Sequence, residues 1–86
     1  MSKFRFFTYD DAGSDTIELT MSAPKDDGAV LQSVYSGMET ICTTFTKYDA
    51  TFDYYSPTRS YLDVRIDRGD MSRVFTYLRS RGFERA

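Results

Sequence analysis

The chain has 86 residues, a net charge of −2, no histidine and one cysteine. This length predicts one compact domain over residues 1–86, with a core large enough for only marginal stability unless aromatic packing or association adds to it. The composition excludes an intramolecular disulfide, a cysteine metal cluster and any nucleophile–histidine pair, and the weak net charge argues against a dedicated nucleic-acid binder.

A hairpin is predicted at the start of the chain. Residues 4–9 are mostly aromatic, and residues 16–22 alternate between apolar and polar side chains, which is typical of a half-buried strand. An acidic turn over residues 10–15 separates the two strands. We therefore expect an antiparallel pair in which Ile17, Leu19 and Met21 face the core.

A helix is predicted next, after a break at Pro24. Apolar residues recur at spacings of three and four from Leu31 to Phe45, so that one helical face collects them. Cys42 lies within this run, and we expect it to pack in the core as a small apolar side chain. Gly37 lies off the apolar face and lowers the helix propensity by about 1 kcal/mol.

The second half of the chain repeats this order. Residues 51–55 and 61–67 alternate again and predict two more strands, and Asp70 is placed to cap a second helix that Gly82 ends. The expected fold is α+β in the order ββαββα, close to two copies of a hairpin–helix unit. We expect a four-stranded, mostly antiparallel sheet with both helices packed on one face.

The charges are divided unevenly along the chain. Residues 1–58 hold four bases and nine acids, whereas residues 59–86 hold seven bases and four acids. All seven of the later bases are arginines. Because the guanidinium is planar and matches carboxylates and phosphates, this segment is typical of a contact surface.

The predicted packing leaves one sheet face without a helix, and aromatic and arginine side chains are expected on it. These residue types are enriched at the centres of protein interfaces. Cross-strand pairing, for example of Asp53 and Asp63 with Arg65, is the simpler explanation of the same residues. The partner-binding residues predicted on this face and on the second helix are Arg5, Phe7, Tyr9, Tyr55, Tyr61, Arg65, Arg73, Arg79 and Arg81.

No catalytic motif is present, so no catalytic residue, metal ligand or cofactor is predicted. The leading hypothesis is a non-enzymatic module that binds a protein partner, for instance a viral or mobile-element inhibitor of a host protein complex such as a defence system. The alternative is single-stranded nucleic-acid binding by the same face, against which the outward acids Glu18, Asp53 and Asp63 argue. A small enzyme using Asp, Tyr or Arg is the least supported hypothesis.

The sequence also bears on location and association. It has no apolar run of signal-peptide or membrane-spanning length, so we expect a cytoplasmic protein without a membrane partner. A sheet with an uncovered face and two edges predicts a homodimer as a further association state.

Overall fold

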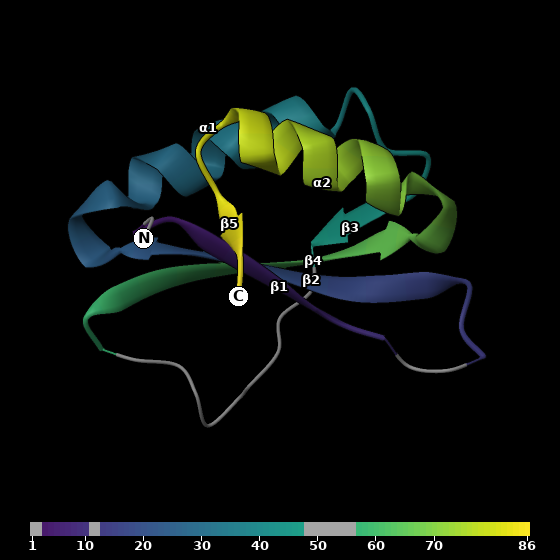
Figure 1. Ribbon diagram of the computed structural model, residues 1–86, viewed down its shortest axis with the longest axis horizontal. Coiled ribbons are helices and arrows are strands. Elements are labelled where there is room, and N and C mark those ends of the chain that lie inside the picture. The colour runs from purple at the N-terminus through teal and green to yellow at the C-terminus, as the bar shows by residue number, and fades with distance from the viewer. Residues whose placement is uncertain (1–2, 11–12, 48–56) are drawn as a thin grey trace.

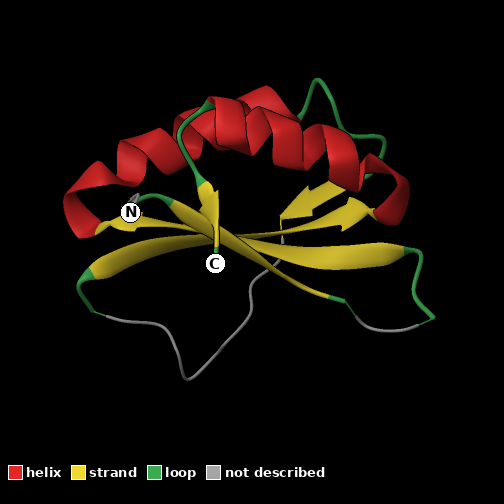
Figure 2. Ribbon diagram, viewed as in Figure 1, coloured by secondary structure: helices red, strands yellow, loops and turns green. Residues whose placement is uncertain are grey.

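Two helices lie on one face of a five-stranded sheet in the computed structural model, which describes residues 3–10, 13–47 and 57–86 (Figures 1 and 2). The α+β class and the placement of both helices on one side agree with the sequence prediction. The elements are β1 (Arg5–Tyr9), β2 (Thr16–Pro24), the 3₁₀ turn η1 (Lys25–Asp27), α1 (Gly28–Met38), β3 (Phe45–Lys47), β4 (Arg59–Asp67), the 3₁₀ turn η2 (Arg68–Asp70), α2 (Met71–Ser80) and β5 (Glu84–Arg85).

The sheet differs from the four-stranded prediction because two short strands were not expected. Its order is β3-β4-β2-β1-β5, and it is mixed: β5 runs parallel to β1, whereas the other neighbours are antiparallel. Strands of two and three residues are too short for an alternating pattern, so periodicity alone cannot find them. The strand predicted over residues 51–55 lies outside the described residues.

The two central strands belong to two units of almost equal length. β2 and β4 each have nine residues, each is followed by a three-residue 3₁₀ turn, and the helices that follow have 11 and 10 residues. The strands pair antiparallel, with Thr20 opposite Asp63. The strand–turn–helix part of the expected hairpin–helix repeat is therefore present twice.

The core lies between the sheet and the helices. Register places Phe6 opposite Met21 and Leu19 opposite Val64, and all four side chains are buried. Alternation in β1 thereby turns Phe6 inward and places Arg5 and Phe7 on the sheet face without helices, where the sequence predicts them. The apolar residues of the two alternating strands are all buried, namely Ile17, Leu19, Met21, Leu62, Val64 and Ile66.

The first helix ends earlier than predicted. It stops at Met38, whose carbonyl accepts from the amides of Ile41 and Cys42, both at 3.1 Å. The Thr40 hydroxyl donates to the Gly37 carbonyl at 2.8 Å. These bonds satisfy carbonyls at the helix end. Ile41, Cys42 and Phe45 still pack against the core from outside the helix, so their helical spacing reflected burial only.

The second helix ends as predicted. Gly82 has φ of 90°, and its amide donates to the Arg79 carbonyl at 3.0 Å. The Phe83 amide donates to the Leu78 carbonyl at 3.0 Å, and the Phe83 side chain is buried. This is the Schellman arrangement, in which a glycine reverses the chain and the next apolar residue packs back. It directs the chain toward β5, beside β1.

No helix in the part of the chain that the structure describes is long and apolar enough to cross a membrane.

Candidate interaction surface

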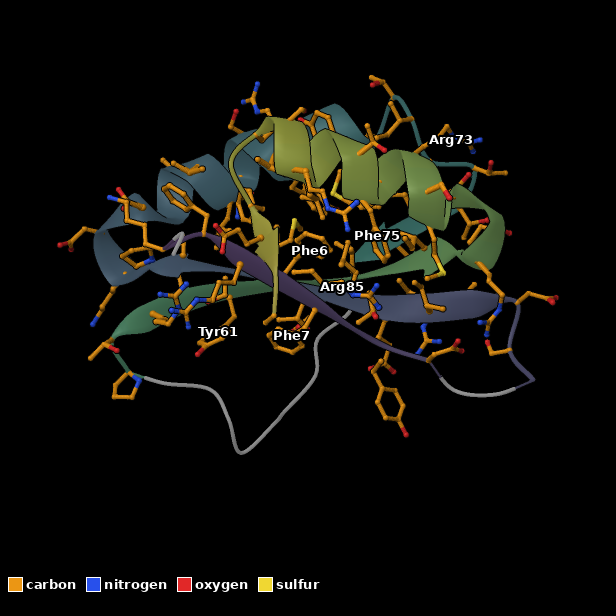
Figure 3. The ribbon with its side chains drawn as sticks, in the orientation of Figure 1. Phe6, Phe7, Tyr61, Arg73, Phe75 and Arg85 are labelled. Atoms are coloured by element: carbon orange, nitrogen blue, oxygen red, sulfur yellow. The ribbon has the colours of Figure 1, made fainter. Side chains whose placement is uncertain are left out.

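The sheet face turned away from the helices, here called the outer sheet face, carries the predicted residues of the strands. Phe7 and Tyr61 point away from the helical layer (Figure 3). Arg5 and Phe7 lie opposite Ser22 and Thr20 of β2. Tyr61 and Arg65 come from β4 on the other side of β2. The outer sheet face consists of Arg5, Phe7 and Tyr9, of Glu18, Thr20 and Ser22, and of Arg59, Tyr61, Asp63 and Arg65.

A hollow of about 350 Å³ lies at one end of the outer sheet face. Arg59 lies two residues before the strand predicted over residues 61–67, but it is the first residue of β4 and forms one wall. Its Nε donates to Ser22 Oγ at 2.6 Å and its Nη2 donates to the Lys3 carbonyl at 2.6 Å. The hollow is lined by Arg5, Phe7, Ser22, Arg59, Tyr61 and Ala86. Extending the alternation of β4 by two residues would have placed Arg59 on this face.

The middle of the outer sheet face is polar and internally bonded. Thr20 donates from its hydroxyl to Asp63 Oδ1 at 2.5 Å. Arg65 donates to Glu18 Oε1 at 2.8 Å and to the Thr16 hydroxyl at 3.0 Å. Glu18 and Arg65 are directly opposite in register, so this is a cross-strand ion pair. The cross-strand explanation therefore holds for Arg65, with Glu18 as its partner.

The other two aromatic residues predicted to bind a partner are Tyr9 and Tyr55, of which the structure describes only Tyr9. Tyr9 is 61% exposed, the one large apolar side chain classed as exposed among residues 3–10, 13–47 and 57–86. It lies at the end of β1. Tyr55 lies outside the described residues.

The predicted arginines of the second helix lie on the other side of the molecule. Arg73 is in the helical layer, far from the side toward which Phe7 and Tyr61 point (Figure 3). It pairs with the carboxylate of Asp70. Arg81 donates to the Ser33 hydroxyl at 3.3 Å, whereas the Arg79 side chain is exposed and makes no polar contact with the described residues. The predicted set is thus divided between two surfaces.

Two arginines of the basic segment bond to acids of the acidic segment within the described residues. Arg65 pairs with Glu18, and Arg68 donates to both carboxylate oxygens of Asp10. The Arg68 bond lowers the pKa of Asp10 below its usual range. Arg85, absent from the prediction, stacks on the Phe75 ring at 4.9 Å. Folding therefore pairs Arg65 and Arg68 of the basic segment with acids of the acidic segment.

A buried carboxylate lies where the two helices meet the connecting turn. Asp70 is 1% exposed, and it accepts from the amide and hydroxyl of Thr43 at 2.6 and 3.1 Å. Burial alone would raise the pKa of Asp70, but the Thr43 bonds and the Arg73 charge outweigh it, and the pKa is lowered. Asp70 precedes α2 as predicted, yet its side chain holds the turn and does not cap the helix.

The chemistry available to the single thiol is limited. Burial, followed by the negative charge of Asp70, raises the pKa of Cys42 to about 11. The thiol is therefore protonated at neutral pH, and the protonated form is a poor nucleophile. Over the described ranges, no three acidic, histidine or cysteine side chains are grouped so as to hold a metal ion.

Comparisons with protein-family models, with curated proteins and with solved structures find no match to this chain.

Proposed function

We propose that this chain is a small protein-binding module without enzymatic activity. It contacts its target through the outer sheet face and through the arginines of the C-terminal segment, Arg73, Arg79 and Arg81. The observation that carries this proposal is the hollow of about 350 Å³ on the outer sheet face, where two arginines and two aromatic rings converge. Arginine and aromatic side chains account for much of the binding free energy at protein interfaces.

The construction of the hollow supports binding by a preformed surface. Arg59 is held by Ser22 and by the Lys3 carbonyl, so its guanidinium has a defined position before any partner arrives. A side chain already held in place loses less conformational entropy on binding. A partner residue that combines an apolar body with a carboxylate or carbonyl acceptor would match this wall of the hollow.

The high pKa of the thiol supports the non-enzymatic part of the proposal, because Cys42 is the chain's only cysteine and it is protonated at neutral pH. A narrower form of the proposal is that the module inhibits a protein complex of a host, on behalf of a virus or mobile element.

The test is retention of a partner by the immobilised chain from a lysate of the cells in which it acts, after nuclease treatment. Wild type is compared with Tyr61→Ala and Arg5→Glu, which alter the hollow. Lys25→Glu is the matched control, because it makes the same charge change at an exposed position outside the hollow. We expect one stoichiometric protein with wild type and Lys25→Glu, and its loss with both hollow variants at an unchanged melting temperature.

Two results would contradict the proposal. Equal retention by all four proteins would remove the outer sheet face from the contact. Recovery of nucleic acid alone, lost as salt rises, would favour the single-stranded nucleic-acid alternative, because bound arginines release counterions. The acids that the sequence set against this alternative are not free charges on the outer sheet face, because Glu18 pairs with Arg65 and Asp63 is buried beside Thr20.

A further inference from the structure

A second hollow, here called the helix groove, lies on the helical side of the molecule. It runs between α2 and the turn that follows α1, and its volume is about 430 Å³. The groove belongs to the layer in which Figure 3 shows Arg73, away from the outer sheet face. Its lining residues are Ile41, Ser72, Arg73, Thr76, Tyr77 and Ser80.

Both walls of the helix groove are held by contacts within the chain, one by hydrogen bonds and one by close packing. Asp70 precedes α2 and accepts two hydrogen bonds from Thr43, so the turn carrying Ile41 is tied to the start of α2. On the other side, Tyr77 packs closely against α1, because a Cβ added to Gly37 would collide with the Tyr77 hydroxyl oxygen. The groove is therefore formed before a ligand enters.

The lining combines apolar contact with positive charge and hydroxyl groups. Ile41 and Tyr77 are half-buried and pack against the core. Three hydroxyl side chains, those of Ser72, Thr76 and Ser80, are exposed along α2 at intervals of four residues, so they share one helical face. No acid lines the groove, and α2 contains none.

Two arginines border this hydroxyl face. Arg73 pairs with the buried Asp70 carboxylate, which fixes the position of its guanidinium. The Arg73 side chain is still 59% exposed, so its remaining N–H groups can donate to a ligand. Arg79 follows Thr76 by three positions and therefore neighbours it on the helix surface. The Arg79 side chain is exposed and forms no ion pair with the described residues, so its charge is available to a partner.

We infer that the helix groove takes an acidic peptide segment of a protein partner. One apolar side chain of that segment packs over Ile41 and Tyr77, and flanking carboxylates bond to Arg73 and Arg79. The inference rests on the proposed function and names the partner chemistry for its helical arginines. A peptide fits better than a nucleic acid, because two arginines with an apolar floor suit separate carboxylates rather than a continuous row of phosphates.

The test is an NMR titration of the isotope-labelled full chain, which does not require the natural partner. The probe is a blocked pentapeptide with leucine between two pairs of glutamates. We expect saturable shifts of the amide signals of Ser72, Thr76 and Ser80. Arg79→Glu is expected to weaken binding by about tenfold, since a like charge replaces an attractive one. Lys25→Glu is the matched control and should change the affinity by less than about twofold.

Three outcomes would overturn the inference: no saturable shift in the groove, equal shifts with a peptide whose glutamates are replaced by lysines, or the same shifts with inorganic phosphate alone, which would indicate a general anion site. These failures differ from failure of the proposed function. If a partner is retained from lysate and lost with Tyr61→Ala while the titration is negative, the proposed function holds. The helix groove is then not the site of an acidic peptide.

Discussion

The two strand–turn–helix units of this protein share their lengths but differ at the helices. α1 contains no charged residue, whereas α2 contains Arg73 and Arg79 and no acid. The aspartates that precede the helices also differ: Asp27 is partly exposed and pairs with Lys3 at 3.5 Å, whereas Asp70 is buried. The two units therefore share their architecture but differ in the charge that they carry. The first helix supplies packing, and the second also carries charge and holds the connecting turn.

Replacing each of the two aspartates in turn tests most directly whether they contribute differently to stability. Asp70→Ala leaves the Thr43 amide and hydroxyl without their acceptor and Arg73 without its ion pair. We expect the melting temperature to fall by about 10 °C or more, because losses of this kind weigh heavily in a small domain. Asp27→Ala removes only a partly exposed pair and should shift it by about 3 °C or less. Thermal unfolding followed by circular dichroism measures both.

Similar losses for both variants would show that the two positions are equivalent in energy as well as in sequence. Asp70→Asn distinguishes charge from shape at the buried position, because an amide keeps one acceptor and loses the ion pair.

The buried aspartate also predicts how stability depends on pH. The pKa of Asp70 lies below its ordinary value of 3.8, because the Thr43 bonds and Arg73 outweigh burial. The unfolded chain binds this proton more tightly, so the carboxylate adds stability above that value, and the contribution is lost as pH falls through the folded-state pKa. Urea unfolding at a series of acidic pH values should show that the free energy of unfolding falls less steeply with decreasing pH for Asp70→Asn than for wild type.

The exposed carboxylate of Asp10 provides the comparison for that experiment. Its pKa is also lowered, through the bond from Arg68, but the pair is open to solvent. Asp10→Asn should leave most of the acid sensitivity in place, and an effect as large as that of Asp70→Asn would contradict the role given to burial.

The two helix ends offer a smaller contrast. Gly82, after α2, has φ of 90°, a conformation that other residues adopt only with strain. Gly82→Ala should destabilise the fold by about 1–2 kcal/mol. Glu39, at the C-cap of α1, has φ of −58°, so Glu39→Ala should cost less than about 0.5 kcal/mol. Urea unfolding of both variants tests this, and equal free energies would exclude a special role for the left-handed turn.

The smallest expected effect concerns Gly37, where the two helices approach each other. Alanine favours a helix over glycine by about 1 kcal/mol, but its methyl group would collide with Tyr77. Gly37→Ala should therefore raise the free energy of unfolding little in wild type, and by nearly the full ~1 kcal/mol when it is made in Tyr77→Ala. A double-mutant cycle measures the coupling, and additive free energies would contradict the close packing.

Patterns carried by burial predicted much of this fold. The alternation of β2 and β4 identified their core residues, and Gly82 identified the end of α2. The same signal was misleading after Met38. Ile41, Cys42 and Phe45 kept a helical spacing, yet they lie in a turn and a short strand, because burial selects apolar residues whatever the backbone conformation.

The candidate surfaces were predicted less well, since side-chain partners depend on distant segments. Arg65 and Arg68 belong to the basic segment that the sequence indicates as a contact surface, but they pair with Glu18 and Asp10 of the same chain. Arg59 was not singled out, yet it lines the hollow on the outer sheet face.

Local chemistry in the sequence determined the α+β class, the inward side of each central strand and the glycine that ends the second helix. These follow from periodicity and backbone preference, which act between near neighbours. Tertiary structure alone decided the parallel pairing of β5 with β1, the use of Asp70 to hold Thr43, and the division of the arginines between two faces. Each of these depends on contacts between residues far apart in the chain, which no local pattern records.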